Sequence, residues 1–242
     1  MGDYWKSWSS TSALEFYKKH RGKRSDVYKS EKHFLQKILG PGTSILDVGC
    51  AAGGFYNVLR SYQPNISYTG VDISGEMIAE ARKLHPDLHF EVGGGDDLPF
   101  QDNSFDMVMC LGTLHMVLNW REIIEERWRV AKGYLLFDLR LVEKGPTIED
   151  IVKSYMKIAF DGKWDGRSKV PYVTLNVKDA FSAINRLRPK PSKVESYGYF
   201  HPVSHMATTP YKEVCMAMFL LGKSKNMGRQ KIEWNVPLAL PK

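Results

Sequence analysis

The sequence predicts an α/β fold in which helices cover both faces of a doubly wound, mostly parallel sheet. Short apolar runs alternate with helical patterns from residue 44 to residue 139. The run at 106–111 has no polar alternation, as expected for a strand that is covered on both faces. The spacing of the runs suits crossover helices, which parallel strands require. The 242 residues are enough for one such domain, 1–242, and few for two.

The elements of the predicted sheet follow one another in chain order. Two helices, at 12–20 and 26–39, should form a cap over residues 1–40, the first capped by Thr11 or Ser12 and the second ended by Gly40-Pro41-Gly42. We expect strands at 44–47, 67–71, 88–92, 106–111 and 134–139, and helices at 54–61, 75–84 and 120–130.

The pattern changes after residue 140. Residues 143–174 form an insertion, with a helical stretch at 148–159 and a polar loop at 161–169. A helix at 177–187 and strands at 193–199 and 213–221 follow, joined by a loop too long for a tight hairpin. Residues 226–242 form a tail with three apolar side chains.

Composition limits the class of protein. The N-terminal residues contain no apolar h-region and no apolar run reaches the length of a membrane span, so we expect neither export nor a span. The three cysteines form no C-x-x-C pair, so we expect them to be reduced, in a cytoplasmic protein. The net charge of +7 is concentrated in the N-terminal region and the tail. This charge could attract nucleic acid or an anionic small molecule, or could be a solvated face without a partner.

One stretch indicates a ligand site. A small-residue loop, Gly49 to Gly54, follows the first strand and its final Asp47, and precedes a helix. A second strand ends in Asp72. Two parallel strands that each end in an acid suit a ligand with an amine at one end and a ribose diol further along.

Four stretches together resemble the class I S-adenosylmethionine-dependent methyltransferases, and within them the group of ubiquinone/menaquinone-type enzymes. They are Ile-Leu-Asp-Val-Gly-Cys-Ala-Ala-Gly at 45–53, Gly-Val-Asp-Ile-Ser-Gly-Glu-Met at 70–77, Asp-Leu-Pro-Phe at 97–100 with Asn-Ser-Phe-Asp at 103–106, and Leu-His at 114–115 with Asn-Trp at 119–120. The resemblance covers about residues 40–140. It implies a Rossmann-like sheet of seven strands, of which the last is antiparallel, and S-adenosylmethionine as cofactor with S-adenosylhomocysteine as product.

The resemblance also assigns roles to residues of the cofactor site. Asp47 and Gly49, with the backbone from Ala51 to Gly53, would hold the methionine end, and Asp72 would bind the ribose hydroxyls. The side chains of Ile73 and Met77 would pack on adenine, and Cys110 and Leu111 would lie near the sulfonium.

The chain departs from the family pattern in two places. Ala51 replaces a usual glycine, which costs stability only where a positive φ is needed. Gly94 and Gly95 stand where an acid usually contacts adenine, and Asp96 could take its place. A dinucleotide site is the alternative, but Asp47 would repel a pyrophosphate.

Three residues are candidates for catalysis. His115 follows the fourth strand and could act as a general base or could serve packing. His201, like its neighbour His205, could contact substrate from the loop between the last two strands or could simply be exposed. Arg140 ends the fifth strand and could bind an anionic substrate group, or could pair with Asp138 or Glu143. No metal site is expected, because the oxygen ligands of magnesium-dependent relatives are missing.

The acceptor is not named by any motif. The insertion, the loop and the tail should shape the acceptor pocket. Their aromatic residues favour a small-molecule acceptor of the sugar, glycan or natural-product type, methylated on oxygen. An RNA-modifying enzyme and a non-catalytic cofactor-binding protein are the alternatives. The side chains of Tyr4, Trp5 and Trp8 could form a lid over the cofactor or could dock the N-terminal helix onto the core. The oligomeric state is left open.

Overall fold

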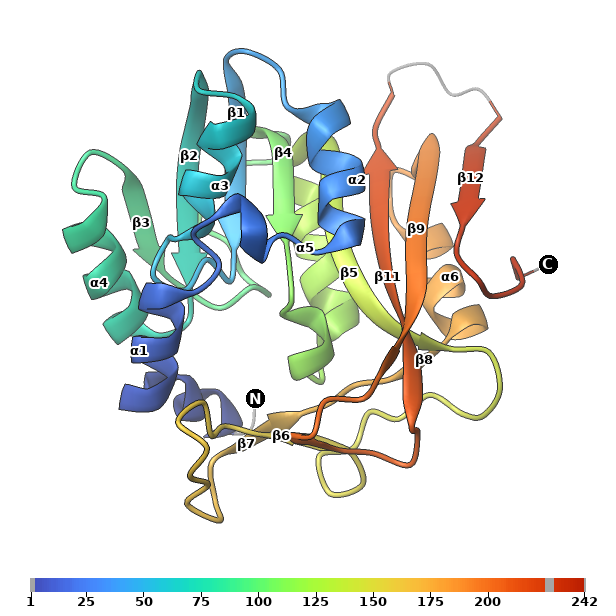
Figure 1. The fold of residues 1–242 in the computed structure, drawn as a ribbon. Coiled ribbons are helices and arrows are strands. Elements are labelled where there is room, and N and C mark those ends of the chain that lie inside the picture. The colour runs from blue at the N-terminus through green and yellow to red at the C-terminus, as the bar shows by residue number, and fades with distance from the viewer. Residues whose placement is uncertain (1–2, 225–228, 242) are drawn as a thin grey trace.

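The fold is built on a nine-stranded sheet with the strand order β12-β9-β11-β5-β4-β1-β2-β3 and β8 paired with β5 (Figure 1). The computed structural model describes residues 3–224 and 229–241, so residues 1–2 of the predicted cap and 226–228 and 242 of the predicted tail lie outside it. The strands of this sheet are β1 (Thr43–Val48), β2 (Ile66–Asp72), β3 (His89–Val92), β4 (Phe105–Cys110), β5 (Ala131–Val142), β8 (Leu175–Asn176), β9 (Lys193–Pro202), β11 (Glu213–Gly222) and β12 (Lys231–Asn235).

The direction of the strands agrees with the predicted fold class. The pairs among β1 to β5 are all parallel, and β11 runs antiparallel to both β5 and β9. The seven predicted strands are all present. The tail adds an unpredicted strand, β12, which pairs with β9 in parallel.

Helices cover both faces of the sheet. In front of it in Figure 1 lie α2 (Lys29–Ile38) and α3 (Phe55–Tyr62), and α4 (Gly75–Leu84) packs on the same face. Behind it lie α5 (Trp120–Val130) and α6 (Val177–Arg186). Neighbouring residues of a strand point to opposite layers: Ile45 packs with the first group and Leu46 with the second. This alternation is what a strand covered on both faces requires.

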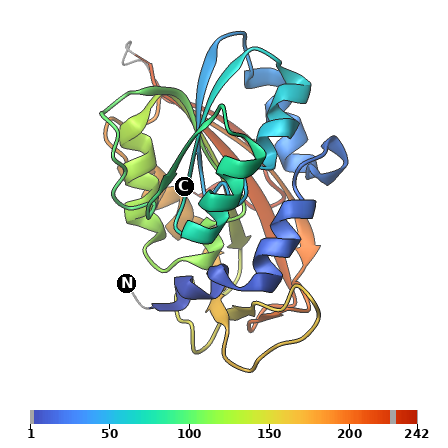
Figure 2. The same cartoon turned by 90° about the vertical axis from the view of Figure 1, so that its left-hand side faces the viewer.

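The N-terminal segment lies below the sheet, beside α4 (Figure 2). It consists of the 3-10 helix η1 (Asp3–Ser9), α1 (Thr11–Lys19) and the short 3-10 helix η2 (Arg24–Asp26). Ser10 caps α1 by accepting a hydrogen bond from the Ala13 amide at 3.3 Å, so neither of the two predicted capping residues has that role. The Ser9 hydroxyl donates to Glu76 at the start of α4 over 2.6 Å, which ties the segment to the core.

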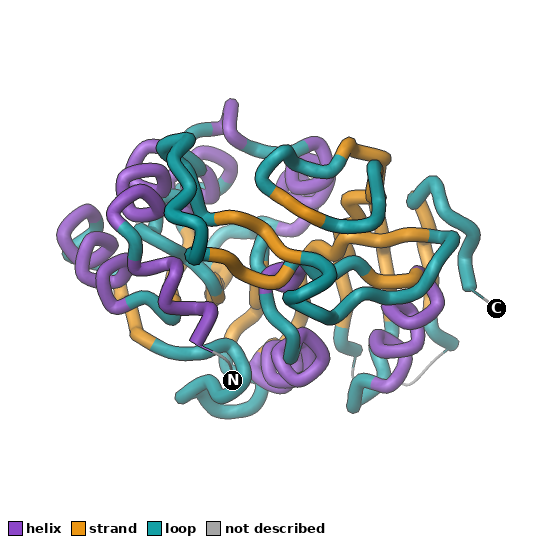
Figure 3. The backbone as a smooth tube through the Cα atoms, turned by 90° about the horizontal axis from the view of Figure 1, so that it is seen from below, coloured by secondary structure: helices purple, strands orange, loops and turns teal. Residues whose placement is uncertain are grey.

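The insertion contains strands where a helix was predicted. Residues 148–159 are not helical: β6 (Tyr155–Lys157) pairs with β7 (Lys169–Pro171) and with β10 (Ala207–Thr208) in a small antiparallel sheet. Seen from below in Figure 3, these strands cross the edge at which the parallel strands end. A short 3-10 helix, η3 (Leu114–Met116), follows β4.

A third apolar cluster joins the N-terminal segment, the small sheet and the loops of the large one. Its buried members are Ala13, Ala52, Met77, Met116, Met156, Ile158, Val170 and Tyr172. The N-terminal segment and the insertion therefore pack together over the carboxyl ends of the parallel strands. In an open α/β sheet, this edge is where ligands bind.

Candidate functional site

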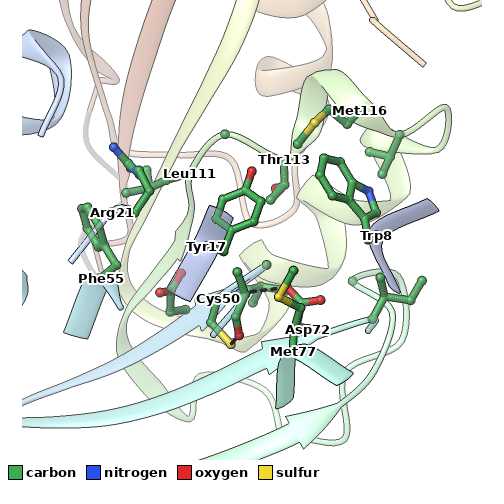
Figure 4. Close-up of a pocket in the computed structure, with 18 of the residues that line it drawn as sticks. Trp8, Tyr17, Arg21, Cys50, Phe55, Asp72, Met77, Leu111, Thr113 and Met116 are labelled. Carbon is green, nitrogen blue, oxygen red and sulfur yellow. Dashed lines mark hydrogen bonds between the residues drawn. The ribbon is translucent and has the colours of Figure 1, made fainter. Parts of the chain in front are cut away.

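A cavity of about 360 Å³ lies between the carboxyl ends of the parallel strands and this cap. Ten of the predicted site residues line it: Asp47, Gly49, Ala51, Asp72, Ile73, Met77, Gly95, Leu111, His115 and Arg140. Five others do not belong to its lining: Gly53, Gly94, Asp96, Cys110 and His201. Figure 4 shows Asp72 and Met77 on one side of the cavity and Trp8 and Met116 on another.

The loop after β1 has a strained backbone that brings amide groups to the cavity. The amides of Gly49 and Cys50 both donate to the Val71 carbonyl, over 2.7 and 3.1 Å. Gly49 has a φ of +87°, and a Cβ there would collide with the Thr113 side chain, so only glycine fits. Ala51 has a φ of +48°. The left-handed conformation that makes alanine costly at this position is therefore present.

Asp72 is held at the end of β2 by backbone amides. Its Oδ2 accepts from the Ala51 amide and its Oδ1 from the Ser74 amide, both over 2.9 Å. Burial raises the pKa of Asp72, and these hydrogen bonds act against the rise. Because a carboxylate has about four acceptor positions, both oxygens can still accept hydrogen bonds from a diol. The carboxylate is thus oriented before any ligand arrives.

Asp47 is a buried carboxyl at the end of β1. Only 4% of the residue is exposed, and its Oδ2 accepts a hydrogen bond from the Tyr68 hydroxyl over 2.7 Å. Burial raises the pKa of Asp47 to about 6, although the Tyr68 hydrogen bond favours the ionised form. A ligand ammonium beside it would favour that form further. The site is therefore suited to a cationic group.

A buried arginine explains why glycine stands in the segment where adenine was expected to bind. Arg127 of α5 donates from Nη1 to the Gly95 carbonyl over 3.0 Å, and a Cβ at Gly95 would collide with its guanidinium. Gly95 and Arg127 both line the cavity. Asp96 is turned away and accepts from the Asn119 side chain over 2.9 Å. Backbone of the glycine segment, and not a carboxylate, thus faces the cavity here.

Sequence reasoning missed an arginine in the N-terminal segment. Arg21 lines the cavity, with its guanidinium 4.9 Å from the centre of the Phe55 ring, and it forms an ion pair with buried Glu31. It has a φ of +68°, so the chain turns sharply at this point. In sequence it is one of several basic residues in a cluster, and no spacing separates it from its neighbours.

The N-terminal aromatic side chains both dock and line the cavity. Tyr4, Trp5 and Trp8 belong to its lining, and Tyr17 lies between the Arg21 and Trp8 sides in Figure 4. Burial raises the pKa of Tyr17 to about 12, so its hydroxyl stays protonated. Phe160 of the insertion stacks on Phe16 with ring centres 4.4 Å apart. These contacts connect the N-terminal segment to the insertion.

The catalytic candidates differ in their placement. His115 is 7% exposed, and its Nδ1 has no hydrogen-bond partner within the described residues. Burial, supported by the positive charge of Arg140, lowers the pKa of His115 to about 3. His201 is exposed on β9, with Nδ1 2.6 Å from the Pro202 carbonyl, and it lies outside the cavity. His115 and His201 are therefore not brought together.

Arg140 forms one of the two ion pairs considered from sequence. Its Nη1 donates to Asp138, whose other oxygen accepts from the Gly112 amide over 2.5 Å. Although burial acts to raise it, the pKa of Asp138 is held below its usual value by the Arg140 guanidinium. The pair connects the end of β5 to the loop after β4. Arg140 lines the cavity, and Asp138 does not.

In residues 3–224 and 229–241, no group of three or more histidine, cysteine or acidic side chains is arranged to hold a metal ion. None of the helices in the same ranges has the length and hydropathy needed to cross a bilayer. The three cysteines are free and buried.

Comparisons with known proteins agree with this geometry. The family model described as "Methyltransferase domain" matches residues 46–137. A phthiotriol/phenolphthiotriol dimycocerosates methyltransferase of Mycobacterium ulcerans is 36% identical over 104 residues, which are 41% of this chain and 38% of that protein. A fatty-acid O-methyltransferase of Mycolicibacterium smegmatis is 35% identical over 101 residues, 40% of this chain and 36% of that protein. The matched segment thus spans under two fifths of these relatives.

The fold has solved counterparts. A structure described as a SAM-dependent methyltransferase from Methanosarcina mazei superimposes with a TM-score of 0.57 at 20% identity, covering 81% of this chain and 98% of that one. The match to the family model and the likeness of the folds agree. Residues 46–137 match a methyltransferase domain, and the chain has the fold of a solved SAM-dependent methyltransferase.

Proposed function

We propose that the protein is an S-adenosylmethionine-dependent O-methyltransferase whose acceptor is a small molecule with a long apolar part. The observation that carries the proposal is the lining of the cavity beneath the cap. There the side chains are thioethers and aromatic rings: Trp8, Met116, Met156, Phe160 and Met206. Methionine side chains are flexible and polarizable, and they adapt to apolar ligands of varied shape. An alkyl chain would be shielded from water in such a chamber.

The two curated relatives support this choice of acceptor. Their names describe methyl transfer to phthiotriol dimycocerosates and to fatty acids. The family model matches residues 46–137, whereas Met156, Phe160 and Met206 belong to the insertion and the later loop. The apolar character of the cap is therefore an argument separate from the resemblance. A glycan-type acceptor, favoured by the sequence, would meet thioethers under the cap, where Met116, Met156 and Met206 offer its hydroxyls no hydrogen-bond donor.

In the proposed enzyme, the cofactor residues keep the roles that the resemblance implies. The carboxylate of Asp72 would accept from the ribose hydroxyls, and ionised Asp47 would face the ammonium group. The methionine carboxylate would have Arg21 as its cationic partner, since Arg21 lines the same cavity. The adenine ring would lie between Ile73 and Met77 and the glycine segment at Gly95.

The chemistry requires positioning and exclusion of water more than proton transfer. S-adenosylmethionine, when bound, supplies a methyl group that is already activated on a sulfonium. The chain would hold the acceptor oxygen in line with that methyl and keep water out by closing the cap. The insertion, residues 143–174, and the N-terminal segment would together form the acceptor chamber.

Binding and turnover test this proposal in two steps. Calorimetry with S-adenosylhomocysteine should give saturable binding that Asp72→Ala weakens at least about tenfold, because a charge-assisted contact to the ribose is lost. Labelled S-adenosylmethionine should then transfer its methyl group to long-chain acids, alcohols or phenols. Faster transfer to sugars or to RNA would contradict the apolar acceptor, and absence of binding would contradict the enzyme. The matched control is Asp87→Ala, an exposed acid outside the cavity.

A further inference from the structure

We infer that the reacting group of the acceptor is a carboxylate, received by the guanidinium of Arg140 together with the imidazole of His115, so that the product is a methyl ester. This inference rests on the proposed function and specifies its substrate class. It is drawn from a buried cation and an unpartnered buried nitrogen that share one cavity.

Arg140 places a buried cation in the wall of the cavity. The residue is 8% exposed, and Asp138 accepts a hydrogen bond from its Nη1. A guanidinium carries five N–H donors in a planar fork that matches a carboxylate. The positive charge of Arg140 also acts on the nearby Tyr172 hydroxyl, where it opposes the rise in pKa that burial causes. Donors therefore remain for an acceptor carboxylate that enters from the cavity side.

His115 supplies the second observation. Its Nδ1 is buried and has no partner among the described residues, which is costly for a polar atom unless a ligand completes the hydrogen bond. The ring packs against Tyr172 with centres 5.6 Å apart, in an edge-on arrangement. Tyr172 is thus near both groups, and the positive charge of Arg140 acts on the imidazole as well.

The charge state of the imidazole favours an acid over an alcohol. Because the pKa of His115 is lowered to about 3, the ring is neutral and is a weak proton acceptor. An alcohol needs a general base near the operating pH. A carboxylate is already anionic and needs none, and a neutral imidazole can donate one N–H to it.

The transfer step then balances without a proton. A lone pair of the carboxylate oxygen forms the new O–CH₃ bond while the S–CH₃ bond breaks, and the bonding pair remains on sulfur. The anionic acid and the cationic sulfonium give a neutral ester and a neutral thioether. Methylation of an alcohol would instead release one proton in each turnover.

The first experiment compares hexadecanoic acid with 1-hexadecanol in weakly buffered solution containing a pH indicator. We expect methyl transfer to the acid with no proton release beyond the background, and kcat/KM for the alcohol at least about 100-fold lower. Faster transfer to the alcohol, with one proton released per methyl group, would overturn the inference while leaving the methyltransferase proposal intact. Absence of S-adenosylhomocysteine binding would show that the proposed function itself is wrong.

The second experiment removes the Arg140 guanidinium without leaving the buried Asp138 carboxylate unpaired. The double variant Asp138→Asn with Arg140→Met should lose about 10- to 100-fold in kcat/KM for the acid, mainly through KM, as expected for a charge-assisted hydrogen bond. Asp138→Asn alone keeps the fork and is the matched control, and it should keep the preference for the acid. Calorimetry with S-adenosylhomocysteine verifies that both variants fold. A double variant with unchanged KM for the acid would overturn the role of Arg140.

Discussion

Ala51 shows how one residue stores strain at the cofactor loop. Its φ of +48° is in the left-handed region, where a non-glycine residue costs roughly 1–2 kcal/mol. The conformation points the Ala51 amide at Asp72 Oδ2, 2.9 Å away. The strain is therefore linked to the orientation of the carboxylate proposed to bind ribose.

Replacing Ala51 by glycine should stabilise the protein. The gain is the relieved strain less the added entropy of an unfolded glycine, a net of about 0.5–1 kcal/mol, measurable by urea unfolding. Ala52→Gly is the matched control: Ala52 is 1% exposed and is not among the residues with positive φ, so its variant should be destabilised. Equal effects of the two changes would contradict the argument.

Asp47 makes stability depend on pH with a definite sign. Its pKa is about 6 in the folded protein because of burial, against an ordinary value of 3.8. Between these values the folded state binds more protons than the unfolded state, so this group's contribution to stability falls as pH rises from about 4 to 6. Above pH 6 Asp47 is ionised in the folded state as well. Its burial then lowers the free energy of unfolding by about 3 kcal/mol, which corresponds to a shift of two pKa units.

Asp47→Asn should remove this cost and weaken cofactor binding. Relative to wild type, the variant should gain more unfolding free energy at pH 7.5 than at pH 5, because only the acid ionises in that range. For S-adenosylhomocysteine, wild-type affinity should rise from pH 5 to 7 and the variant's should rise less. Asp72, whose pKa burial also raises, adds a dependence of the same sign that the variant retains. An equal gain in stability at both pH values would show that Asp47 does not titrate there.

The insertion marks the limit of prediction at the level of elements. Its apolar residues suggested a helix at 148–159, yet Val152 is 78% exposed and Tyr155–Lys157 form strand β6. The partners of β6 are residues 169–171 and 207–208, far away in sequence. Strand formation depends on such partners, and no local pattern contains them. Strands β4 and β5 of the large sheet could be predicted because each contains a nearly continuous apolar run, whereas β8 and β12 of the same sheet were not predicted.

Phe160 connects the insertion to the N-terminal segment. Its ring lies 4.4 Å from Phe16 and 5.6 Å from Tyr17, centre to centre. Phe160→Ala should therefore loosen the cap, with a loss of about 1–2 kcal/mol for a half-buried ring, and should speed dissociation of S-adenosylhomocysteine about tenfold. Stopped-flow displacement measures the rate.

The control for Phe160→Ala is a substitution of Trp164, another large aromatic residue of the insertion. Trp164 is 38% exposed and does not line the cavity. Trp164→Ala should leave the dissociation rate within about twofold of wild type. If both variants release the product at the wild-type rate, the cap does not retain the ligand.

At the scale of the whole molecule, the cavity is assembled chiefly from three separate parts of the chain, to which the loop after β9 adds Met206. The strand loops between residues 47 and 140 were predicted from sequence because their motifs are local. The N-terminal segment and the insertion were predicted as a cap and a pocket wall without their contacts. Arg21 and Arg127 were missed, since each acts through a partner that sequence does not place beside it: Phe55 and Gly95.

Ligand binding should couple these three parts. At 100 times its Kd, S-adenosylhomocysteine stabilises the folded state by about 2.7 kcal/mol. Since the cavity touches all three parts, hydrogen exchange should slow in η1 and α1 and in β6 as well as at residues 47–54 and 72–77. Residues of α6, which do not line the cavity, should change only as far as global stability requires. Protection confined to the strand loops would show that the cap does not close over the cofactor, and the acceptor chamber would then have to be sought elsewhere.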